Sequence, residues 1–425
     1  MMRCGSRSTF KVTALNHGRV IPFFFIALIT LYACDSKKIN EAGNNDNHGP
    51  AENDSLHHYY TVDEFVMGAD LSYVNEVLDH GGVYRDSGSV TDPYQIFADY
   101  GTNVVRLRIW HNPEITMQVY GASGTELYND LLDAAKSIAK VKALGMSAAV
   151  DFHYSDYWAD AGWQEIPKAW KAIRDIGVLR DSVYQYTKKS LLYLNQNGLM
   201  PEMVQIGNEI NCGMLYSNAP SGFPALNACN GNWKNLGSVI NKAVQAVREV
   251  SESSDIKTRI ILHIAQPENV EWWFDNITTA GGVTDFDIVG FSYYDLWSRV
   301  SLVDISTQVA RFRVKFSRDV MIMETAYPWT MENADSYANI FGTSSLVQGY
   351  PATPEGQKDY LIELTQKVIA GGGKGIFYWE PAWITSQLKD KWGTGSSWEN
   401  NAFFDFNGNA LPAFDFMTYK YDFGN

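Results

Sequence analysis

The run MVQIGNE at residues 203–209, together with VMIME at residues 320–324, decides the fold class of this 425-residue chain. Each run is short and apolar, which is typical of a buried strand. Each ends on a glutamate, Glu209 in the first run and Glu324 in the second. We interpret both runs as strands that carry a carboxylate at the C-terminal end, which is the end where (β/α)8 barrels place their active sites.

Further runs of the same kind recur along the chain, and segments with helical periodicity lie between most of them. With the two above, the expected strands are 65–70, 104–110, 146–153, 204–209, 260–263, 288–293, 320–324 and 376–380. Helices are expected at 127–144, 191–197, 233–250, 302–316 and 354–370. Eight strand–helix repeats predict an α/β fold, a closed (β/α)8 TIM barrel forming a single catalytic domain with long βα loops. The alternative is an open doubly wound sheet, but no glycine-rich phosphate loop follows the first strand.

The N-terminal region indicates export. A basic segment precedes the apolar residues 20–30, and Leu31-Tyr32-Ala33-Cys34 resembles a bacterial lipobox. We therefore expect a lipoprotein signal peptide at 1–33, a lipidated Cys34 with a flexible polar linker at 34–58, and the catalytic domain at 59–425. An ordinary secretory signal with a chance cysteine is the alternative. The expected location is a bacterial membrane, with the outer membrane favoured and the face left open.

Composition limits the binding partners. The net charge of −14 argues against nucleic acid and against anionic polymers. A neutral polymer remains compatible, and we expect a monomer. The 13 Trp and 24 Tyr residues suit either a large core or platforms for sugar rings.

Two cysteines remain for the folded domain, Cys212 and Cys229. They lie 17 residues apart in an apparently exported protein, which predicts a disulfide, with two free thiols as the alternative. No CxxC or His/Cys cluster indicates zinc.

Polar residues gather at the expected C-terminal ends of the strands. They are Asp70, Arg106, Arg108, Asp151, His153, Asn208, Glu209, His263, Tyr293, Glu324, Trp379 and Glu380. Any one of them could be structural, but a set drawn from most strands indicates a site. Two carboxylates about 5–5.5 Å apart are the machinery of a retaining glycosidase, one as nucleophile and the other as acid and base.

Several side chains are expected to assist that pair. Asn208 would hold the sugar 2-hydroxyl, Arg108 would keep Glu324 ionised, and Tyr293 would donate to the same carboxylate. Asp151 and His153 would join the polar network around the sugar. Tryptophans follow the strand ends as candidate platforms, with loop packing as the alternative: Trp110, Trp163, Trp297, Trp329, Trp379 and Trp383.

Local motifs narrow the family. GADLS at 68–72, VRLRIW at 105–110, DFHYSDYWAD at 151–160, QIGNEI at 205–210 and ETAYPW at 324–329 resemble glycoside hydrolase family 53, the arabinogalactan endo-β-1,4-galactanases. The resemblance runs from about residue 65 to the C-terminal region. It implies Glu209 as acid/base, Glu324 as nucleophile, no catalytic cofactor, and hydrolysis of the β-1,4-galactan side chains of pectin. With both catalytic carboxyls assigned, Glu380 is expected to be structural, and Trp379 matches the clan's strand-eight tryptophan.

The resemblance also raises a structural calcium ion in the loop after the seventh strand. The matching ligands are Asn333, Asp335, Tyr337 through its carbonyl, and Asn339. This sequence has Asn and Tyr where the family pattern has Asp and His, and fewer charges predict weaker binding of the ion.

Two other functions stay open at this point. Another retaining β-glycanase of the clan, such as a β-mannanase, would use the same glutamates. A surface glycan-binding lipoprotein would need aromatic platforms but not two opposed glutamates.

Overall fold

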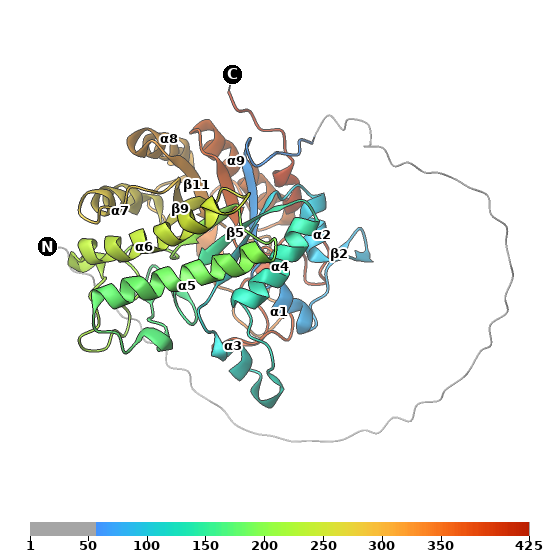
Figure 1. Ribbon diagram of the computed structural model, residues 1–425. Coiled ribbons are helices and arrows are strands. Elements are labelled where there is room, and N and C mark those ends of the chain that lie inside the picture. Colours follow the sequence, from blue (N-terminus) through green and yellow to red (C-terminus); the bar gives the residue numbers. More distant parts are fainter. Residues whose placement is uncertain (1–56, 425) are drawn as a thin grey trace, which may run out of the picture. The chain divides into compact units, whose positions relative to one another are not determined.

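The structure is a computed structural model that describes residues 57–424 (Figure 1). The signal peptide, the lipidated Cys34 and nearly all of the linker that the sequence predicts lie outside the described residues. Among those described, no helix combines the length and the apolar character needed to cross a membrane.

Eight parallel strands close into a barrel in the order β1-β12-β11-β10-β9-β8-β5-β4. Their bounds are β1 Val66–Asp70, β4 Val104–Ile109, β5 Ser147–Phe152, β8 Met203–Ile206, β9 Arg259–Ala265, β10 Ile288–Ser292, β11 Asp319–Glu324 and β12 Gly375–Tyr378. The predicted TIM barrel is confirmed, and the open-sheet alternative is wrong. The strands β4, β5, β8, β10 and β12 end one to three residues earlier than predicted, so several site residues lie on the loops.

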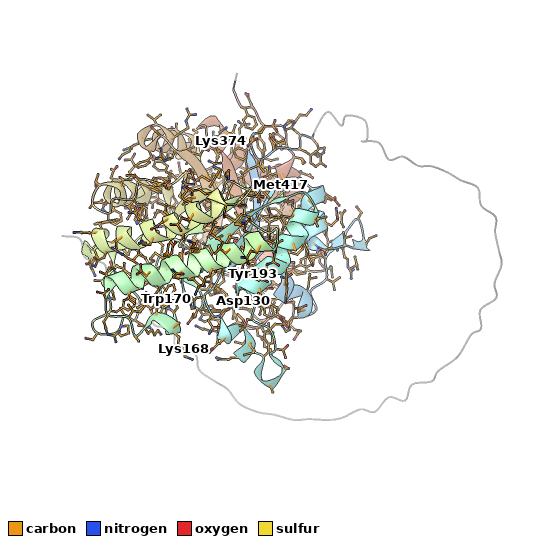
Figure 2. All side chains as sticks on the ribbon, in the orientation of Figure 1. Asp130, Lys168, Trp170, Tyr193, Lys374 and Met417 are labelled. Carbon is orange, nitrogen blue, oxygen red and sulfur yellow. A yellow bond between two sulfur atoms is a disulfide. The ribbon has the colours of Figure 1, made fainter. Side chains whose placement is uncertain are left out.

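Helices form the layer outside the barrel (Figure 1). They are α1 Val74–Asp79, α2 Pro93–Asp99, α3 Glu114–Gln118, α4 Leu131–Ala143, α5 Ile176–Gln196, α6 Trp233–Glu252, α7 Pro267–Thr279, α8 Ile305–Phe316 and α9 Pro354–Ala370. The side chain of Asp130, labelled in Figure 2, accepts from the backbone N–H of Asp133 and so caps the start of α4. Pro354 occupies the first turn of α9, as the sequence predicts.

The loops between these elements contain short strands and 3-10 helices. Two small hairpins pair β2 Arg85–Asp86 with β3 Ser89–Val90, and β6 Ala159–Asp160 with β7 Trp163–Gln164. Short 3-10 helices are η1 Gly121–Ser123, η2 Lys168–Trp170, η3 Ala228–Asn230, η4 Leu302–Asp304, η5 Thr343–Ser345, η6 Glu399–Asn401 and η7 Pro412–Met417. The β6–β7 hairpin matters most for function, because it stands beside the end of β8.

The barrel interior is a packed core. Its buried residues are Val66, Val104, Ala149, Met203, Ile261, Ile288, Met321, Met323 and Phe377. Gly68 on β1 is required there, because a Cβ atom would stand 2.2 Å from the ring of Phe377. The polar side chains that point into the barrel therefore lie at its C-terminal end, beyond this layer of apolar residues.

Candidate active site

Arg106 stands at the centre of the C-terminal mouth of the barrel. Its Nη1 donates to Asp70 Oδ2 at 3.1 Å and to Glu324 Oε1 at 3.0 Å. Its Nη2 donates to Asp151 Oδ2 at 2.7 Å and to Asn208 Oδ1 at 2.9 Å. One buried cation thus gathers side chains from β1, β5, β11 and the loop after β8, which offsets the desolvation of a buried charge.

The expectation that Arg108 lies beside Glu324 is wrong. Arg108 Nη1 instead donates to Glu380 Oε1 at 2.5 Å, and its guanidinium carbon lies 4.2 Å from the Tyr73 ring centroid. The register explains the difference. Asp70, the last residue of β1, pairs with Arg106. Arg108 therefore lies one layer higher, among residues that follow β1 and β12, and Glu380 serves as its buried partner.

The expectation that Tyr293 contacts Glu324 is also wrong, and it misses by one residue. The phenol of Tyr293 donates to Val300 O at 3.2 Å, away from the barrel axis. The phenol of Tyr294 donates to Glu324 Oε2 at 3.1 Å. Side chains alternate along a strand, so once Ser292 faces the axis, Tyr293 faces outward and Tyr294 inward.

Glu209 is held on a sharply turned backbone. β8 ends at Ile206, and both Gly207 (φ 77°) and Glu209 (φ 47°) take left-handed conformations. A non-glycine residue in that region is strained, and such strain gathers at functional sites. Glu209 Oε1 lies 2.6 Å from Ser292 Oγ, and its Oε2 accepts from the Ala161 N–H at 3.3 Å.

Both glutamates favour the protonated form more than a free carboxyl does. Burial raises the pKa of Glu324 to about 8, although the Arg106 charge opposes this. Burial also raises the pKa of Glu209, although the hydrogen bond with Ser292 opposes it. Because the two carboxyls repel each other when both are ionised, the pair keeps a proton near neutral pH. Burial alone would place this proton on Glu324. The two oxygens of Glu324, however, accept hydrogen bonds from Arg106 and Tyr294, and these donors favour the ionised form of Glu324.

The two glutamates open into one cavity of about 650 Å³. Its aromatic lining comes from Trp158, Tyr294, Trp297, Tyr337, Trp379, Trp383, Trp392 and Trp398. Of the predicted platforms, Trp297, Trp379 and Trp383 lie there. Four further lining residues were not predicted from the sequence: Trp158, Trp392, Trp398 and Tyr294. Trp158 stands in the quoted 151–160 motif, but the long loop after β12 gave no periodic signal that could place the other two tryptophans.

Three predicted tryptophans do not line this cavity. Trp110 is fully buried, with its indole N–H directed at His153 Nδ1 at 3.2 Å. Trp329 donates through its indole N–H to Glu399 O at 3.0 Å. Trp163 stands on the exposed β6–β7 hairpin. Trp110 is therefore a packing residue beneath the site.

Asp151 and His153 also lie below the cavity. His153 Nε2 stands 3.1 Å from Asp151 Oδ2, and both side chains are buried. His153 Nδ1 faces two donors, the Trp110 indole and the Ala159 backbone N–H, each at 3.2 Å. This fixes the proton of His153 on Nε2, where it donates to Asp151. The pair thus orients Arg106, and neither side chain is among the residues that line the cavity.

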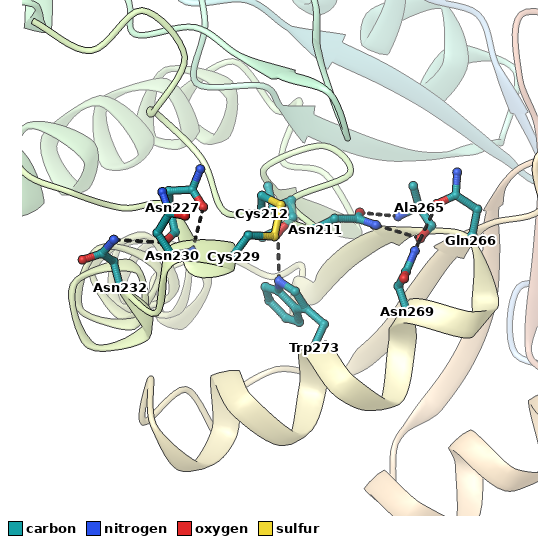
Figure 3. Close-up of a disulfide and its surroundings, with 11 residues drawn as sticks. Asn211, Cys212, Asn227, Cys229, Asn230, Asn232, Ala265, Gln266, Asn269 and Trp273 are labelled. Atoms are coloured by element: carbon teal, nitrogen blue, oxygen red, sulfur yellow. Dashed lines mark hydrogen bonds between the residues drawn. A yellow bond between two sulfur atoms is a disulfide. The ribbon is translucent and has the colours of Figure 1, made fainter. Parts of the chain in front are cut away.

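A disulfide joins Cys212 to Cys229 and staples the loop after Glu209 (Figure 3). The predicted pairing is confirmed. On the same segment, the Trp273 indole N–H donates to Ile210 O at 2.8 Å, and Asn211 exchanges two hydrogen bonds with Ala265 at 2.7 and 3.0 Å. Glu209 is therefore followed by three consecutive anchored residues.

The loop after β11 offers oxygen atoms but few charges. Asp335 is the carboxylate among the four predicted calcium ligands, and its oxygens accept from Tyr337 N and Ser396 N. In the part of the chain that the structure describes, no group of three or more His, Cys, Asp or Glu residues is placed to hold a metal. Two buried oxygens nearby have no hydrogen-bond partner, Asn339 Oδ1 and Glu399 Oε2. Oxygen donors of this kind fit a hard cation such as Ca²⁺.

Comparison with known proteins agrees with this geometry. The model of glycosyl hydrolase family 53 matches residues 66–417. An arabinogalactan endo-beta-1,4-galactanase of Cellvibrio japonicus is 43% identical over 361 residues, which is 84% of this chain and 91% of that protein. An endo-beta-1,4-galactanase of Bacillus subtilis is 30% identical over 84% of this chain and 86% of its own length.

Solved structures agree as well. The family 53 catalytic domain of Ignisphaera aggregans superposes with a TM-score of 0.75 at 32% identity, covering 85% of this chain and 98% of that domain. One of two fungal beta-1,4-galactanases gives a TM-score of 0.66 at 27% identity, covering 82% of this chain and 98% of its own. The barrel, the paired glutamates and the match over most of the chain lead to one conclusion: this protein belongs to glycosyl hydrolase family 53.

Proposed function

We propose that the protein is an endo-acting, retaining hydrolase of β-1,4-galactan, the type I arabinogalactan side chain of pectin. The observation that carries this proposal is that Glu209 and Glu324 open into the same aromatic cavity with different hydrogen-bond donors. The relatives named as endo-β-1,4-galactanases support the choice of substrate.

The first step uses Glu324 as nucleophile. The charge of Arg106 and the phenol of Tyr294 hold its two oxygens, so the carboxylate is oriented toward the cavity. As Glu324 attacks the anomeric carbon, Glu209 gives its proton to the leaving oxygen, and a covalent galactosyl-enzyme forms.

The second step reverses the role of Glu209. Its carboxylate now takes a proton from water, which attacks the anomeric carbon and releases the galacto-oligosaccharide with the original β configuration at its new reducing end. Asn208 serves both steps. Its amide donates one hydrogen to Ala159 O at 3.0 Å, which leaves the second for the sugar 2-hydroxyl.

The aromatic lining sets the substrate class. Flat indole faces pack against the C–H faces of neutral sugar rings, and a net charge of −14 does not attract an acidic polymer. Tryptophans contributed by the loops after β5, β10 and β12 fit a chain that extends beyond one sugar on both sides of the scissile bond.

The test is reducing-end release from β-1,4-galactan by the mature domain, with β-mannan and cellulose in parallel. Rapid release from galactan alone, with oligomers appearing early, supports the proposal. Release from mannan or cellulose instead would replace the substrate. No release from any polymer, combined with retained binding, would favour a glycan-binding lipoprotein.

A structural calcium ion is a separate part of the proposal. Asp335, Asn333, Asn339 and the buried Glu399 would supply oxygens, with Tyr337 contributing its carbonyl. Chelation should then lower the melting temperature of the wild type but not of Glu399→Gln. Equal melting temperatures of the wild type with and without chelator would exclude the ion.

We also propose a lipid anchor on Cys34, export to a bacterial outer membrane, and a monomeric domain. Cys34→Ser should move the protein from the membrane fraction to the soluble fraction. A wild-type protein that is already soluble would contradict the anchor.

A further inference from the structure

Gln266 lines the cavity that holds the two glutamates, and its backbone is strained. It follows β9 directly, with a φ of 56° and a ψ of 133°. The next residue is Pro267, which favours the extended ψ, but a positive φ is disfavoured for any residue that has a Cβ atom. The side chain of Gln266 makes no capping hydrogen bond to α7, so helix capping does not account for this conformation. Strained residues of this kind gather at ligand sites.

The backbone of Ala265 fixes the orientation of the Gln266 amide. A backbone carbonyl only accepts, so the Asn269 atom that lies 3.1 Å from Ala265 O is the amide nitrogen. The same nitrogen lies 3.1 Å from the Gln266 amide, and because it only donates, Gln266 presents Oε1 to it. Figure 3 shows the amide nitrogen of Gln266 on the side away from Asn269. Within residues 57–424, Gln266 Nε2 donates no hydrogen bond.

The same segment connects Gln266 to the proposed acid, Glu209. The backbone N–H of Asn211 donates to Glu209 O at 2.8 Å, and the side chain of Asn211 exchanges its two hydrogen bonds with Ala265. Both Gln266 and Glu209 line the cavity. The two hydrogens on Gln266 Nε2 are therefore held at a fixed place near the carboxyl that protonates the leaving oxygen.

The order of the strands divides the cavity into two sides. β9 and β10 lie between β8, which precedes Glu209, and β11, which ends at Glu324. β5, β4, β1 and β12 complete the ring on the other side. A polysaccharide that passes between the two carboxyls has the attacked sugar on one side and the leaving sugar on the other.

The attacked sugar belongs on the side of β5 and β12. Asn208, which we propose for its 2-hydroxyl, is anchored on that side by its hydrogen bond to Ala159 O. Trp379, from the loop after β12, lines the same side. The leaving sugar then lies over the loops after β9 and β10, where Gln266 and Trp297 line the cavity.

We infer that Gln266 is a specificity-determining residue that donates a hydrogen bond to a hydroxyl of the leaving sugar. The strained backbone and the hydrogen bond from Asn269 orient the donor before the substrate binds, which lowers the entropic cost of the contact. An aryl leaving group has no hydroxyl at this place and gains nothing from Gln266. This inference rests on the proposed hydrolysis of galactan with Glu209 as the acid.

The first experiment compares kcat/KM on β-1,4-galactan with kcat/KM on an aryl β-galactobioside. Gln266→Met keeps the length of the side chain but has no donor. We expect it to lower kcat/KM on galactan by about 5- to 10-fold, the effect of one lost hydrogen bond, and to change the aryl substrate by less than about twofold. Gln245→Met, on the exposed face of α6, is the matched control and should change neither. Equal losses on both substrates, or an unchanged value on galactan, would overturn the inference.

The second experiment measures transfer to an acceptor sugar. The acceptor binds where the leaving sugar departs, its hydroxyl attacks the anomeric carbon, Glu209 takes the proton, and the bond to Glu324 breaks. With an aryl β-galactobioside as donor and galactobiose as acceptor, Gln266→Met should lower the ratio of transfer to hydrolysis by about 5- to 10-fold. A ratio equal to that of the wild type would contradict the role of Gln266.

Gln266→Gly separates the amide from the fold. Glycine adopts a φ of 56° without strain, so this variant should melt no lower than the wild type. It has no amide, so it should lose as much activity on galactan as Gln266→Met does. Full activity of a folded Gln266→Gly on galactan would overturn the inference.

The wild type alone decides the proposed function. A wild type that cleaves neither substrate would refute the proposed function. A wild type that cleaves both substrates, combined with variants that lose activity equally on both, would refute only the role of Gln266.

Discussion

Arg106 and Glu324 lie 218 residues apart in the sequence, yet their side chains meet at 3.0 Å across the barrel mouth. The same guanidinium also donates to Asp70, Asp151 and the amide oxygen of Asn208. The charge state of the proposed nucleophile is therefore set by a residue on a different strand, through a cation shared among three carboxylates.

Arg106→Lys should move the acidic limb of the pH profile. A lysine keeps one charge but cannot serve four acceptors from two nitrogens, so Glu324 is less well stabilised as an anion and its pKa rises. The acidic limb of kcat/KM should shift to higher pH, with kcat reduced by about 10²-fold or more. Arg108→Lys is the matched control, since Arg108 contacts Glu380; the same shift in that variant would contradict our assignment.

Azide should separate the roles of the two glutamates. With an aryl β-galactoside, Glu209→Ala still forms the covalent intermediate, because the leaving group needs no acid. Azide then attacks that intermediate and gives a β-galactosyl azide. In Glu324→Gly, azide takes the place of the nucleophile and gives the α product. Carbon and proton NMR of the products distinguish the two, and reversed stereochemistry would exchange the assignments.

Trp158 and Trp379 should matter for substrate binding, whereas Trp329 should not. Both of the former line the cavity, and Trp329 does not. Loss of an indole that packs on a sugar removes about 1.5–3 kcal/mol of apolar contact, or roughly 10–100-fold in KM. Trp158→Ala and Trp379→Ala are measured against Trp329→Phe on galacto-oligosaccharides. An unchanged KM in the first two would remove them from the site.

Stability should fall as pH rises through the neutral range, partly because of Glu76. This buried carboxyl accepts from the Tyr120 phenol at 2.8 Å, and burial raises its pKa from 4.5 to about 8. The folded state thus binds a proton that the unfolded state has lost between these values. The stabilisation is complete below about pH 4.5 and decreases as pH rises toward 8, by up to about 1.4 kcal/mol per pH unit.

Glu76→Gln removes that titration and keeps an oxygen for Tyr120. Its melting temperature should exceed that of the wild type at pH 8 by more than it does at pH 5. Parallel curves for the two proteins between these pH values would show that Glu76 ionises at little cost in the folded state.

The disulfide should contribute stability without being needed for catalysis. Closing a 17-residue separation stabilises by about 3 kcal/mol in the chain-entropy model. Cys212→Ser/Cys229→Ser should lose roughly this much in urea unfolding and keep most of its kcat, because Ile210 and Asn211 still anchor the segment. Labelling of the denatured, unreduced domain should find no free thiol; rapid labelling of both cysteines would refute the bridge.

The sequence by itself determined the architecture and the main chemical groups. Apolar runs of strand length that alternate with helical periodicity predict a parallel sheet that is buried on both faces, and eight such repeats without a glycine-rich phosphate loop favour a barrel over an open sheet. Glu209 and Glu324 follow from the same pattern, since each ends an apolar run. The pairing of Cys212 with Cys229 followed from there being two cysteines in the domain.

Tertiary structure alone decided which side chains meet. Arg106 and Arg108 are equivalent by spacing, and so are Tyr293 and Tyr294 as strand-end phenols. The register between β1 and β4 places Arg106, and not Arg108, beside Glu324. The alternation of side chains after Ser292 directs Tyr294, and not Tyr293, toward Glu324. The lining by Trp392 and Trp398 depends on a long loop that folds back over the mouth. Sequence periodicity fixes the face of a strand, but register between strands and the paths of loops arise only when the barrel closes.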